Sequence, residues 1–575
     1  MKLLRALSSL VVTISLVVLF NNRLPLQAPV PPLGKFLDPF KGFWQNCYDN
    51  RANQSLSLSG LESPVEVIYD SLAIAHIFAQ NEKDLYLAQG YVTASDRLWQ
   101  MEFQIHAASG RISEFLGAGK DSVYLNYDRD QRRMGMVFAA ENFINEVEKD
   151  PVLKELGDQY TKGINQFIGQ LTYRDLPVEY KLLDYKPEPW TNLKMALLLK
   201  SMARTLNTGE KDMEMTNALQ KLGLAKLNLL YPDREPVSDP IVNRAGLWPS
   251  PVPADSVTSI LPKETVSVFP SEKTEKDIGS NNWAVSGSKT ITGAPILCND
   301  PHLTLSLPSI WYMVHLNAPG YNAMGASLPG SPGVISGFND SVAWGVTNAQ
   351  RDAVDWYRLK FRDLNMNEYE QDGIWRKTVK RAEVFNVRGA GVFYDTITFT
   401  HHGPVRYDHL FKSKNERARF AYRWLSHDGS NEMRTFYELN KASNIEDYHK
   451  ALNHFATPAQ NFVFASASGD IAIRVQGKFP VRRQMEGRFI LDGSTKASEP
   501  ARYIPYEHNV QETNPVRGFV SSANQYPADS TYPYYITASS YEAFRNRRIN
   551  QRLAAMSGIT VKNMIDLQND NYSLK

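Results

Sequence analysis

The residue whose surroundings point most directly to chemistry is Ser280, in the segment KDIGSNNWAVSG. A serine hydroxyl is a weak nucleophile unless a base accepts its proton. If the bond between Gly279 and Ser280 were cut, Ser280 would carry a free α-amine, whose reference pKa of about 7.7–8.0 leaves a substantial neutral fraction near neutral pH. That amine could accept the proton of its own side chain. Gly and Asn also favour turns, so the local composition alone favours a simpler interpretation, a loop that leads into a strand.

The segment before Ser280 suits such a cut. Residues 232–270 contain eight prolines and show no sustained periodicity. A segment of this length without regular structure is unusual inside a compact domain and indicates a spacer, which would let a severed end move away.

The two sides of this spacer differ in their periodicity. Before it, apolar residues recur at helical spacing in residues 81–117, 151–171, 193–206 and 213–230. Gly90 is the predicted break in the first of these helices. Alternating residues near residue 65 predict a strand pair with its turn at Asp70 and Ser71. After the spacer, strands dominate, including a hairpin over residues 461–477. Ser280 therefore lies at the largest compositional boundary in the chain.

Other common catalytic and binding patterns are absent from the sequence. It contains no G-x-S-x-G, H-E-x-x-H or G-x-x-x-x-G-K-[ST] motif. His401 and His402 are adjacent, so in an extended segment their side chains point to opposite faces, and we do not expect them to bind one metal ion together. The formal net charge is only +2. Without a dense Lys/Arg run, this charge argues against a nucleic-acid partner.

The N-terminus has the pattern of an export signal. A basic start, MKLLR, precedes the uncharged run ALSSLVVTISLVVLF at residues 6–20. This run is shorter than the roughly 20 residues of a membrane span, and no clean A-x-A cleavage site follows it. We expect residues 1–24 to be a signal peptide or signal anchor and residues 25–60 to be a Pro-rich linker. The protein would then be periplasmic, or anchored to the membrane through residues 6–20. Export would also permit, without proving, a disulfide between Cys47 and Cys298.

Several segments in a fixed order resemble the penicillin acylase family of N-terminal-nucleophile hydrolases. PVEVIYDSLAIAHIFAQNEKDLYLAQGYVTASDRLWQ is similar to the family's N-terminal signature, and GSNNWAVSGSKTITGAPILCNDPHL is similar to its nucleophile region. SPGVISGFNDSVAWGVTNAQRDAVDWY, GFVSSANQYP and RNRRINQRL follow in the family's order. The resemblance extends from about Pro64 to the end of the chain.

This resemblance implies an α+β fold, a four-layer αββα sandwich of the N-terminal-nucleophile hydrolase type with a helix-rich first half. It also implies a precursor that cuts itself before Ser280. The expected parts are an α-chain region at residues 61–231, a spacer at residues 232–279 and a β-chain region at residues 280–575. Members usually continue past QNDNYS, whereas this sequence stops at Lys575, so we expect the C-terminal part of the sandwich to be truncated.

The resemblance further implies the roles of individual residues. Ser280 would attack an amide carbonyl and form an acyl-enzyme. The oxyanion would be held by the backbone N–H of Asn348 and by the side chain of Asn524. Ala349 is the alternative to Asn348, one residue further along the chain.

Two further polar residues and an apolar pocket belong to the expected site. His302 would orient the serine amine and the substrate. Arg545 is expected nearby, with Arg547 as the alternative. The acyl pocket would be lined by three apolar residues, Met202, Leu206 and Leu303.

A single structural calcium ion is also implied. Its expected ligands are Asp352, Asp355 and the carbonyl of Val354 in RDAVDW, together with Glu214 from the first half. Asp212 is the alternative to Glu214. Carboxylate and carbonyl oxygens suit this hard cation.

The sequence therefore predicts an exported, self-processed hydrolase of linear N-acyl amides, with α and β chains cut from one precursor. The substrate would be a small molecule, such as a β-lactam side chain, an acyl-homoserine lactone or an acylated peptide. The alternative is a non-catalytic, unprocessed, membrane-tethered scaffold that binds acyl ligands. A general peptidase is a third possibility.

Overall fold

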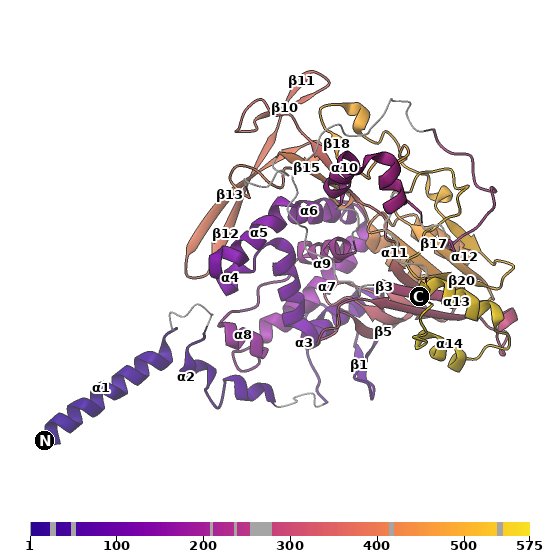
Figure 1. Ribbon diagram of the computed structural model, residues 1–575. Coiled ribbons are helices and arrows are strands. Elements are labelled where there is room, and N and C mark those ends of the chain that lie inside the picture. The colour runs from indigo at the N-terminus through magenta and orange to yellow at the C-terminus, as the bar shows by residue number, and fades with distance from the viewer. Residues whose placement is uncertain are drawn as a thin grey trace.

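A computed structural model describes residues 2–23, 30–47, 53–206, 211–234, 239–253, 279–412, 419–536 and 544–574. These residues form a mixed helix-and-sheet body, from which the N-terminal helix projects (Figure 1). The first half of the chain is helical and the second half is mainly strands, as the periodicity predicts. The helices are α1 (Lys2–Asn21), α2 (Leu33–Phe36), α3 (Glu82–Ser109), α4 (Ser113–Leu116), α5 (Val123–Arg133), α6 (Met136–Val147), α7 (Pro151–Gln170), α8 (Val178–Leu183), α9 (Asn192–Thr205), α10 (Asp212–Leu230), α11 (Glu432–Lys441), α12 (Ile445–Leu452), α13 (Phe544–Ala555) and α14 (Val561–Gln568).

Helix α3 differs from its prediction at Gly90. The helix passes through this glycine without a break. A Cβ atom at Gly90 would lie 2.1 Å from the Tyr160 carbonyl oxygen of α7, and one at Gly163 of α7 would lie 1.9 Å from the Leu87 carbonyl oxygen. The two glycines therefore allow α3 and α7 to pack at very short distance. This contact between distant segments outweighs the small helix-breaking tendency of a single glycine.

Two sheets contain most of the strand residues in the second half of the chain. The larger sheet has the strand order β1-β2-β5-β6-β7-β8-β16-β17-β19. Its strands are β1 (Glu66–Tyr69), β2 (Ala75–Phe78), β5 (Tyr312–Ala318), β6 (Tyr321–Ser327), β7 (Ser336–Asn339), β8 (Val342–Asn348), β16 (Gln460–Ser466), β17 (Ile471–Gln476) and β19 (Gln511–Thr513). The smaller sheet has the order β20-β3-β4, from β20 (Phe519–Ser522), β3 (Gly279–Val285) and β4 (Ile296–His302). The predicted pair β1–β2 and hairpin β16–β17 are both present.

Three small sheets cover one end of the body. They are formed by β10 (Glu368–Gln371) with β11 (Ile374–Lys377), by β12 (Val379–Val387), β13 (Gly391–Thr400) and β14 (Gly403–Pro404), and by β15 (Phe420–Trp424), β9 (Val354–Arg358) and β18 (Leu491–Asp492).

Three apolar cores join helices and sheets into layers. The largest packs α3, α6, α7, α9, α11 and α12 against one face of the nine-stranded sheet. A second core lies between that sheet and the smaller one, where Val463 and Ile473 meet Ala284 and Val520. In the third core, Trp283 of β3 packs on Leu553 of α13 and Met564 of α14. Helices α13 and α14 thus cover the outer face of the small sheet.

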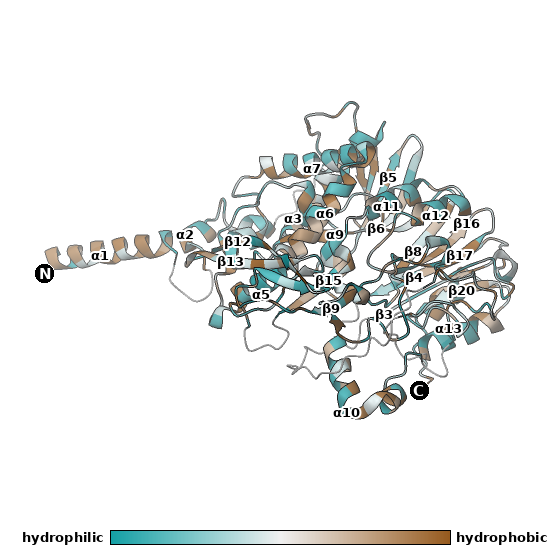
Figure 2. Ribbon diagram, turned by 90° about the horizontal axis from the view of Figure 1, so that it is seen from above, coloured by the Kyte–Doolittle hydropathy of each residue, from teal (hydrophilic) through white to brown (hydrophobic). Residues whose placement is uncertain are grey.

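Helix α1 stands apart from these layers. Its residues are exposed along its whole length, and it is strongly apolar (Figure 2). Among the described residues it is the one helix long and apolar enough to cross a membrane. An apolar, unpacked N-terminal helix is compatible with a signal peptide or an anchor.

Part of the predicted spacer is packed into the body. Ile241 and Val242 are buried, and the Ile241 N–H donates to the Tyr526 carbonyl at 3.1 Å. Residues 235–238 and 254–278 of the spacer lie outside the described residues. Residues 239–253 therefore contribute to the folded chain as it stands, before any cut.

The two cysteines are both free thiols in this structure. Cys47 is exposed near the N-terminus, whereas Cys298 is buried in β4. Burial raises the pKa of the Cys298 thiol to about 12, so it remains protonated at neutral pH.

Candidate active site

Ser280 lies in the middle strand of the small sheet. Strand β3 pairs with β20 on one side and with β4 on the other, where Ser280 lies opposite Pro301. Ser280 is only 3% exposed, and its Oγ donates to the Gly279 carbonyl at 2.5 Å. The Gly279–Ser280 bond is intact in this structure, so the Ser280 amide nitrogen stands in for the α-amine that a cut would release.

Asn524 lies directly beside that nitrogen. It follows β20, is 1% exposed, and has a left-handed backbone with φ 65°, which Asn tolerates better than most residues. Its Oδ1 accepts the N–H of Ser280 at 2.7 Å, and its Nδ2 donates to the Asn348 carbonyl at 2.8 Å. The structure therefore brings together three of the expected site residues.

The backbone at the end of β8 separates the two candidates for an oxyanion donor. The Ala349 N–H donates to the Ala459 carbonyl at 3.2 Å and is thus used on the side of β16. In an antiparallel ladder, successive N–H groups point to opposite sides, so the Asn348 N–H faces away from β16. On that other side, β7 pairs with β8 only at Ala343 and Trp344. This arrangement favours Asn348 over Ala349.

Arg545, rather than Arg547, contacts the serine. One guanidinium nitrogen of Arg545 donates to the Ser280 carbonyl at 2.8 Å and to Asn281 Oδ1 at 2.7 Å. Another donates to Asn524 Oδ1 at 2.9 Å. The guanidinium therefore fixes the peptide after Ser280 and the amide of Asn524 together.

His302 lies at the end of β4, opposite Gly279. Its Nε2 lies 2.7 Å from Asp300 Oδ2, and Asn281 Nδ2 contacts both side chains. The imidazole is 39% exposed and therefore borders the Gly279–Ser280 segment from the solvent side. Asp300 was not among the predicted site residues. It is two residues before His302, on the same face of the strand, and this spacing could have identified it.

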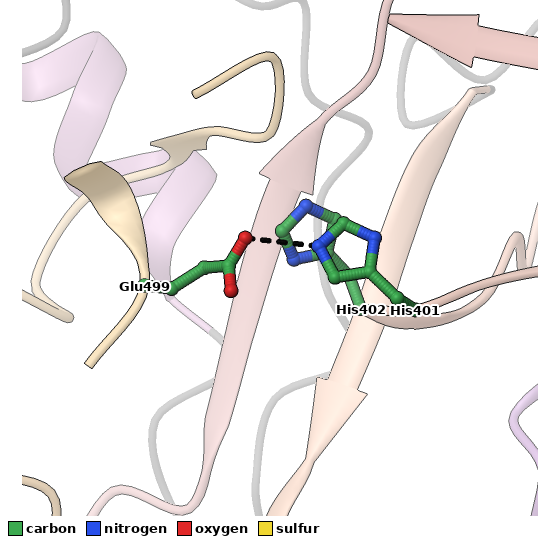
Figure 3. A group of neighbouring side chains, drawn as sticks. All are labelled: His401, His402 and Glu499. Carbon is green, nitrogen blue, oxygen red and sulfur yellow. Dashed lines mark hydrogen bonds and ion pairs between the residues drawn. The ribbon is translucent and has the colours of Figure 1, made fainter. Parts of the chain in front are cut away.

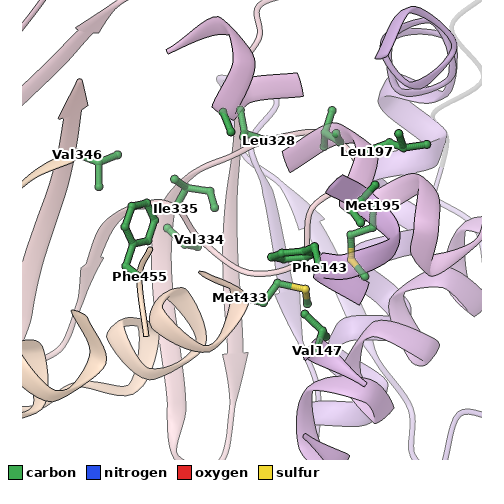
Figure 4. Close-up of a cluster of buried hydrophobic side chains, with 14 of the residues drawn as sticks. Phe143, Val147, Met195, Leu197, Leu328, Val334, Ile335, Val346, Met433 and Phe455 are labelled. Atoms are coloured by element: carbon green, nitrogen blue, oxygen red, sulfur yellow. The ribbon is translucent and has the colours of Figure 1, made fainter. Parts of the chain in front are cut away.

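An apolar cleft of about 710 Å³ opens beside Ser280. The three predicted pocket residues, Met202, Leu206 and Leu303, all line it, together with Asn348. Asn348 Nδ2 also donates to the Leu206 carbonyl at 3.0 Å and so ties α9 to β8. Further lining residues come from elements that the sequence did not connect to the site. They are Trp311 and Phe436, together with Leu328, Ile335, Val346 and Phe455, which are labelled in Figure 4.

One pair of charged residues also lines the cleft. Lys200 Nζ lies 3.7 Å from Glu432 Oε2, and both side chains are almost fully buried. The other carboxylate oxygen of Glu432 accepts the Thr457 N–H at 3.1 Å. Burial lowers the pKa of Lys200. Because the lysine and glutamate face each other, the cleft presents no uncompensated charge from this pair.

The expected calcium ligands are distributed differently from the prediction. Both Asp355 oxygens accept from the Arg482 guanidinium at 2.9 Å. Asp212, the alternative to Glu214, is the carboxyl that faces this pair, and burial with nearby Asp352 and Asp355 raises its pKa well above its ordinary value. Within the described part of the chain, these carboxylates form no group of three with ligand atoms inside 4.8 Å. The residues thus do not form an assembled calcium cage, and calcium remains a prediction.

The expectation that the side chains of His401 and His402 point to opposite faces of an extended segment is wrong. They lie in the turn between β13 and β14, not in an extended segment, and their ring centroids are only 3.8 Å apart. The turn places both imidazoles on the same side, beside Glu499 (Figure 3).

Comparison with known proteins agrees with the resemblance seen in the sequence. Residues 64–575 match the profile of the penicillin amidase family, and the chain belongs to that family. It is 30% identical over 533 residues to the acyl-homoserine lactone acylase QuiP of Pseudomonas aeruginosa, covering 90% of this chain and 61% of that protein. It is 28% identical to the penicillin acylase 2 proenzyme of Pseudomonas sp. strain SE83, covering 96% and 68%.

Similarity to solved structures is weaker. Penicillin G acylase from Alcaligenes faecalis aligns with a TM-score of 0.44 and 23% identity, over 50% of this chain and 52% of that one. This chain spans less than two thirds of the length of the QuiP acylase.

Proposed function

We propose that this protein is an amide hydrolase that removes an apolar acyl group from a small N-acyl amide, with Ser280 as its N-terminal nucleophile. The observation that carries the proposal is the contact of the Ser280 nitrogen with Asn524 Oδ1 at 2.7 Å, where Ser280 lines an apolar cleft. Membership of the penicillin amidase family supports the same reaction class.

Maturation begins at the intact Gly279–Ser280 bond. The Ser280 Oγ attacks the carbonyl carbon of Gly279, the C–N bond breaks, and the nitrogen takes a proton and leaves as the α-amine. The resulting ester joins Gly279 to the Ser280 side chain. Water hydrolyses this ester, giving a Gly279 carboxylate and a free Ser280. The hydroxyl already contacts the Gly279 carbonyl oxygen at 2.5 Å, which supports this geometry.

Catalysis then uses the released amine. In its neutral form it accepts the Oγ proton, and Oγ attacks the acyl carbonyl of the substrate. The Asn348 N–H and the Asn524 Nδ2 donate to the oxyanion that develops. The amine of the substrate takes a proton and leaves, and water hydrolyses the acyl-enzyme to release the acid. Arg545 and His302 act as positioning residues for Asn524 and for the segment around Ser280.

The cleft supports an uncharged acyl group as the substrate's acid part. Its lining is mainly apolar, and its two charged residues, Lys200 and Glu432, neutralise each other, so a charged acyl chain would lose hydration without a free partner of opposite charge. Two similar proteins are named as an acyl-homoserine lactone acylase and a penicillin acylase. Amides of either kind are therefore the first compounds to test.

The proposal also covers the layered fold of the protein and its location in the cell. We propose that the helices, the two sheets and helices α13 and α14 correspond to the αββα sandwich of N-terminal-nucleophile hydrolases, with α and β chains held together after the cut. The word proenzyme in the name of one relative is consistent with such processing. The exposed apolar helix α1 supports export, with the body on the far side of the membrane.

The deciding experiment measures intact masses and fragment N-termini of the purified wild-type chain and its Ser280→Ala variant. Ser288→Ala is the matched control, because Ser288 is an exposed serine on the same segment. We expect wild type and Ser288→Ala to yield a fragment that begins Ser280-Asn281-Asn282, and Ser280→Ala to stay whole. A wild-type chain that stays whole but binds acyl amides would support the unprocessed binding scaffold instead.

A further inference from the structure

A second group of chemically capable side chains involves none of the residues proposed for the amidase site. It consists of His401 and His402, from the turn between β13 and β14, and of Glu499, just after the short 3-10 helix Lys496–Ser498. One ligand atom of each residue lies within 4.8 Å of the other two. Figure 3 shows the two imidazoles and the carboxylate converging from these two segments.

The outer nitrogen of each imidazole is already held by the protein. His401 Nδ1 lies 2.7 Å from the Tyr369 hydroxyl, and His402 Nε2 lies 3.2 Å from the Gly493 carbonyl. His401 Nε2 faces Glu499 Oε1 at 2.9 Å, and His402 Nδ1 is the nitrogen that the Gly493 contact leaves free to bind a ligand. Metal-binding histidines characteristically have this arrangement, in which one nitrogen is fixed by a protein oxygen and the other is directed at the ion.

Gln371 is an independent sign that something is missing from this group. Its side chain is 2% exposed, and its Oε1 has no hydrogen-bond partner among the described residues. Its Nε2 lies within hydrogen-bond distance of both His401 Nε2 and Glu499 Oε1. His401 Nε2 would have to accept from Gln371 and donate to Glu499 at once, which one nitrogen cannot do. A cation bound to His401 Nε2 and Glu499 removes this conflict, and a rotated Gln371 amide could then offer its oxygen.

The donor atoms of this group suit a soft to borderline cation. Two imidazole nitrogens and one carboxylate oxygen match the ligands of Zn²⁺, whereas calcium and magnesium favour oxygen ligands throughout.

A comparable group elsewhere in the chain does not have these features. Glu102, His106 and Glu188 also lie within 4.8 Å of one another. However, Arg111 donates to both oxygens of Glu188, and Tyr180 donates to Glu102. The carboxylates of that group are therefore already neutralised or hydrogen-bonded by neighbouring side chains.

We propose that His401, His402 and Glu499 bind one Zn²⁺ ion, with the fourth position taken by water or by the Gln371 oxygen. The ion joins the β13–β14 turn to the segment after residue 498. His401 and Glu499, which lie in these two segments, are 98 positions apart in the sequence. Its role is structural: it holds the small sheets at this end of the body together.

The test uses the full chain without a histidine tag, stripped with EDTA and dialysed. Calorimetric titration with ZnCl₂ is expected to show one ion per chain, with a rise in Tm on binding. Co²⁺ is expected to give the visible absorption of a tetrahedral nitrogen–oxygen site. Glu499→Gln and His401→Ala should weaken binding by more than the roughly 10–100-fold that loss of an outer partner costs, whereas Tyr369→Phe should fall inside that range.

His454→Ala is the matched control, because His454 is an exposed histidine that lies next to a glutamate as well. It should bind zinc as the wild type does. If His401→Ala fails to fold, Glu499→Gln keeps the test, since it preserves the shape of the side chain. The proposal is overturned if the stripped wild type takes up no stoichiometric zinc, or if both site variants bind it as tightly as the control. Neither result depends on whether Ser280 is a nucleophile.

Discussion

Asn524 bridges Ser280 and Asn348 through the two ends of a single amide group. Its oxygen accepts the Ser280 N–H at 2.7 Å, and its nitrogen donates to the Asn348 carbonyl at 2.8 Å. The same side chain therefore orients the bond proposed for cleavage and carries one of the donors proposed for the oxyanion.

Substitutions of Asn524 should separate its effect on cleavage of the chain from its effect on catalysis. Asn524→Asp keeps the oxygen beside Ser280 but removes the Nδ2 donor, so the chain should still be cut while the mature enzyme loses about 10²–10³-fold in kcat. Asn524→Ala removes both contacts and should also slow the cut. Intact mass and single-turnover hydrolysis measure the two effects. An Asp variant that retains wild-type kcat would exclude Asn524 as an oxyanion donor.

The two neighbouring arginines should differ in their effect. Arg545→Met removes the contacts to the Ser280 carbonyl and Asn524, and because hydrogen bonds to charged groups contribute about 1.5–3 kcal/mol, we expect kcat/KM to fall about 10–100-fold. Arg547→Met, a matched change two residues away, should leave it near the wild-type value. Equal losses in the two variants would contradict the positioning role of Arg545.

The cleft should determine acyl-chain length. Met202 lines it, and Met202→Phe adds bulk there, so we expect KM to rise about tenfold or more for long-chain amides and little for short ones. Met313→Phe is the control, because Met313 is 44% exposed on β5. A length series of N-acyl amides gives the comparison. An unchanged preference in Met202→Phe would place the acyl chain elsewhere.

His427 should make folding sensitive to acid. It is buried, its Nε2 contacts the Met134 carbonyl at 3.0 Å, and its Nδ1 accepts the Trp424 N–H at 3.4 Å, so a second ring proton would face a donor. Burial lowers the pKa of His427 to about 3, against about 6.5 in the unfolded chain. The unfolded state therefore binds the additional proton first. The stability from neutral His427 is complete above pH 6.5 and is lost towards pH 3 by about 1.4 kcal/mol per pH unit.

Urea unfolding of the uncut Ser280→Ala chain between pH 4.5 and 7.5 measures this slope. His427→Gln, which keeps an amide donor for Met134, should be less stable at pH 7 and show a smaller slope. His454→Gln changes an exposed histidine and should leave the slope unaltered. If His427→Gln retained the full wild-type slope, the acid sensitivity would have to come from other groups.

Arg482 should be essential for stability, because it pairs with Asp355, one of the residues predicted to bind calcium. Arg482→Ala leaves Asp355 buried without its guanidinium partner and should cost about 3–5 kcal/mol in the free energy of unfolding. Arg423→Ala, in a less buried pair with Asp428, should cost less. Adding CaCl₂ to Arg482→Ala tests whether a metal ion can replace the guanidinium, which would appear as a recovery of Tm. No recovery would argue against calcium at these carboxylates.

Local patterns predicted the elements that depend mainly on neighbours in the chain. Helix α7 begins at Pro151 after the capping Asp150, and the hairpin β16–β17 turns at Gly469 with φ 106°. Gly90 shows the limit of this approach. Its role is set by α7, about 70 residues away in the sequence, and a single-residue propensity contains no information about that partner.

The candidate site shows the same division. Motif order was enough to select Ser280, Asn524 and Arg545, which the structure brings into contact. The sequence predicted Met202, Leu206 and Leu303 in the lining of the cleft, but not residues such as Phe455, because apolar residues at ordinary spacing look the same in any core. The relative orientation of His401 and His402 was predicted wrongly, because side chains alternate between two faces in a strand but not in a turn.

The position of Gly279 within a strand has a consequence for the rate law of maturation. Gly279 is already paired opposite His302, and the Gly279 carbonyl, the Ser280 hydroxyl and the Asn524 amide all belong to one folded chain. Under the proposed reaction, cleavage is first order: its half-time does not change on dilution, and no second copy or added protease accelerates it. Once folding is complete, each molecule is therefore cut at a rate that does not depend on any other molecule.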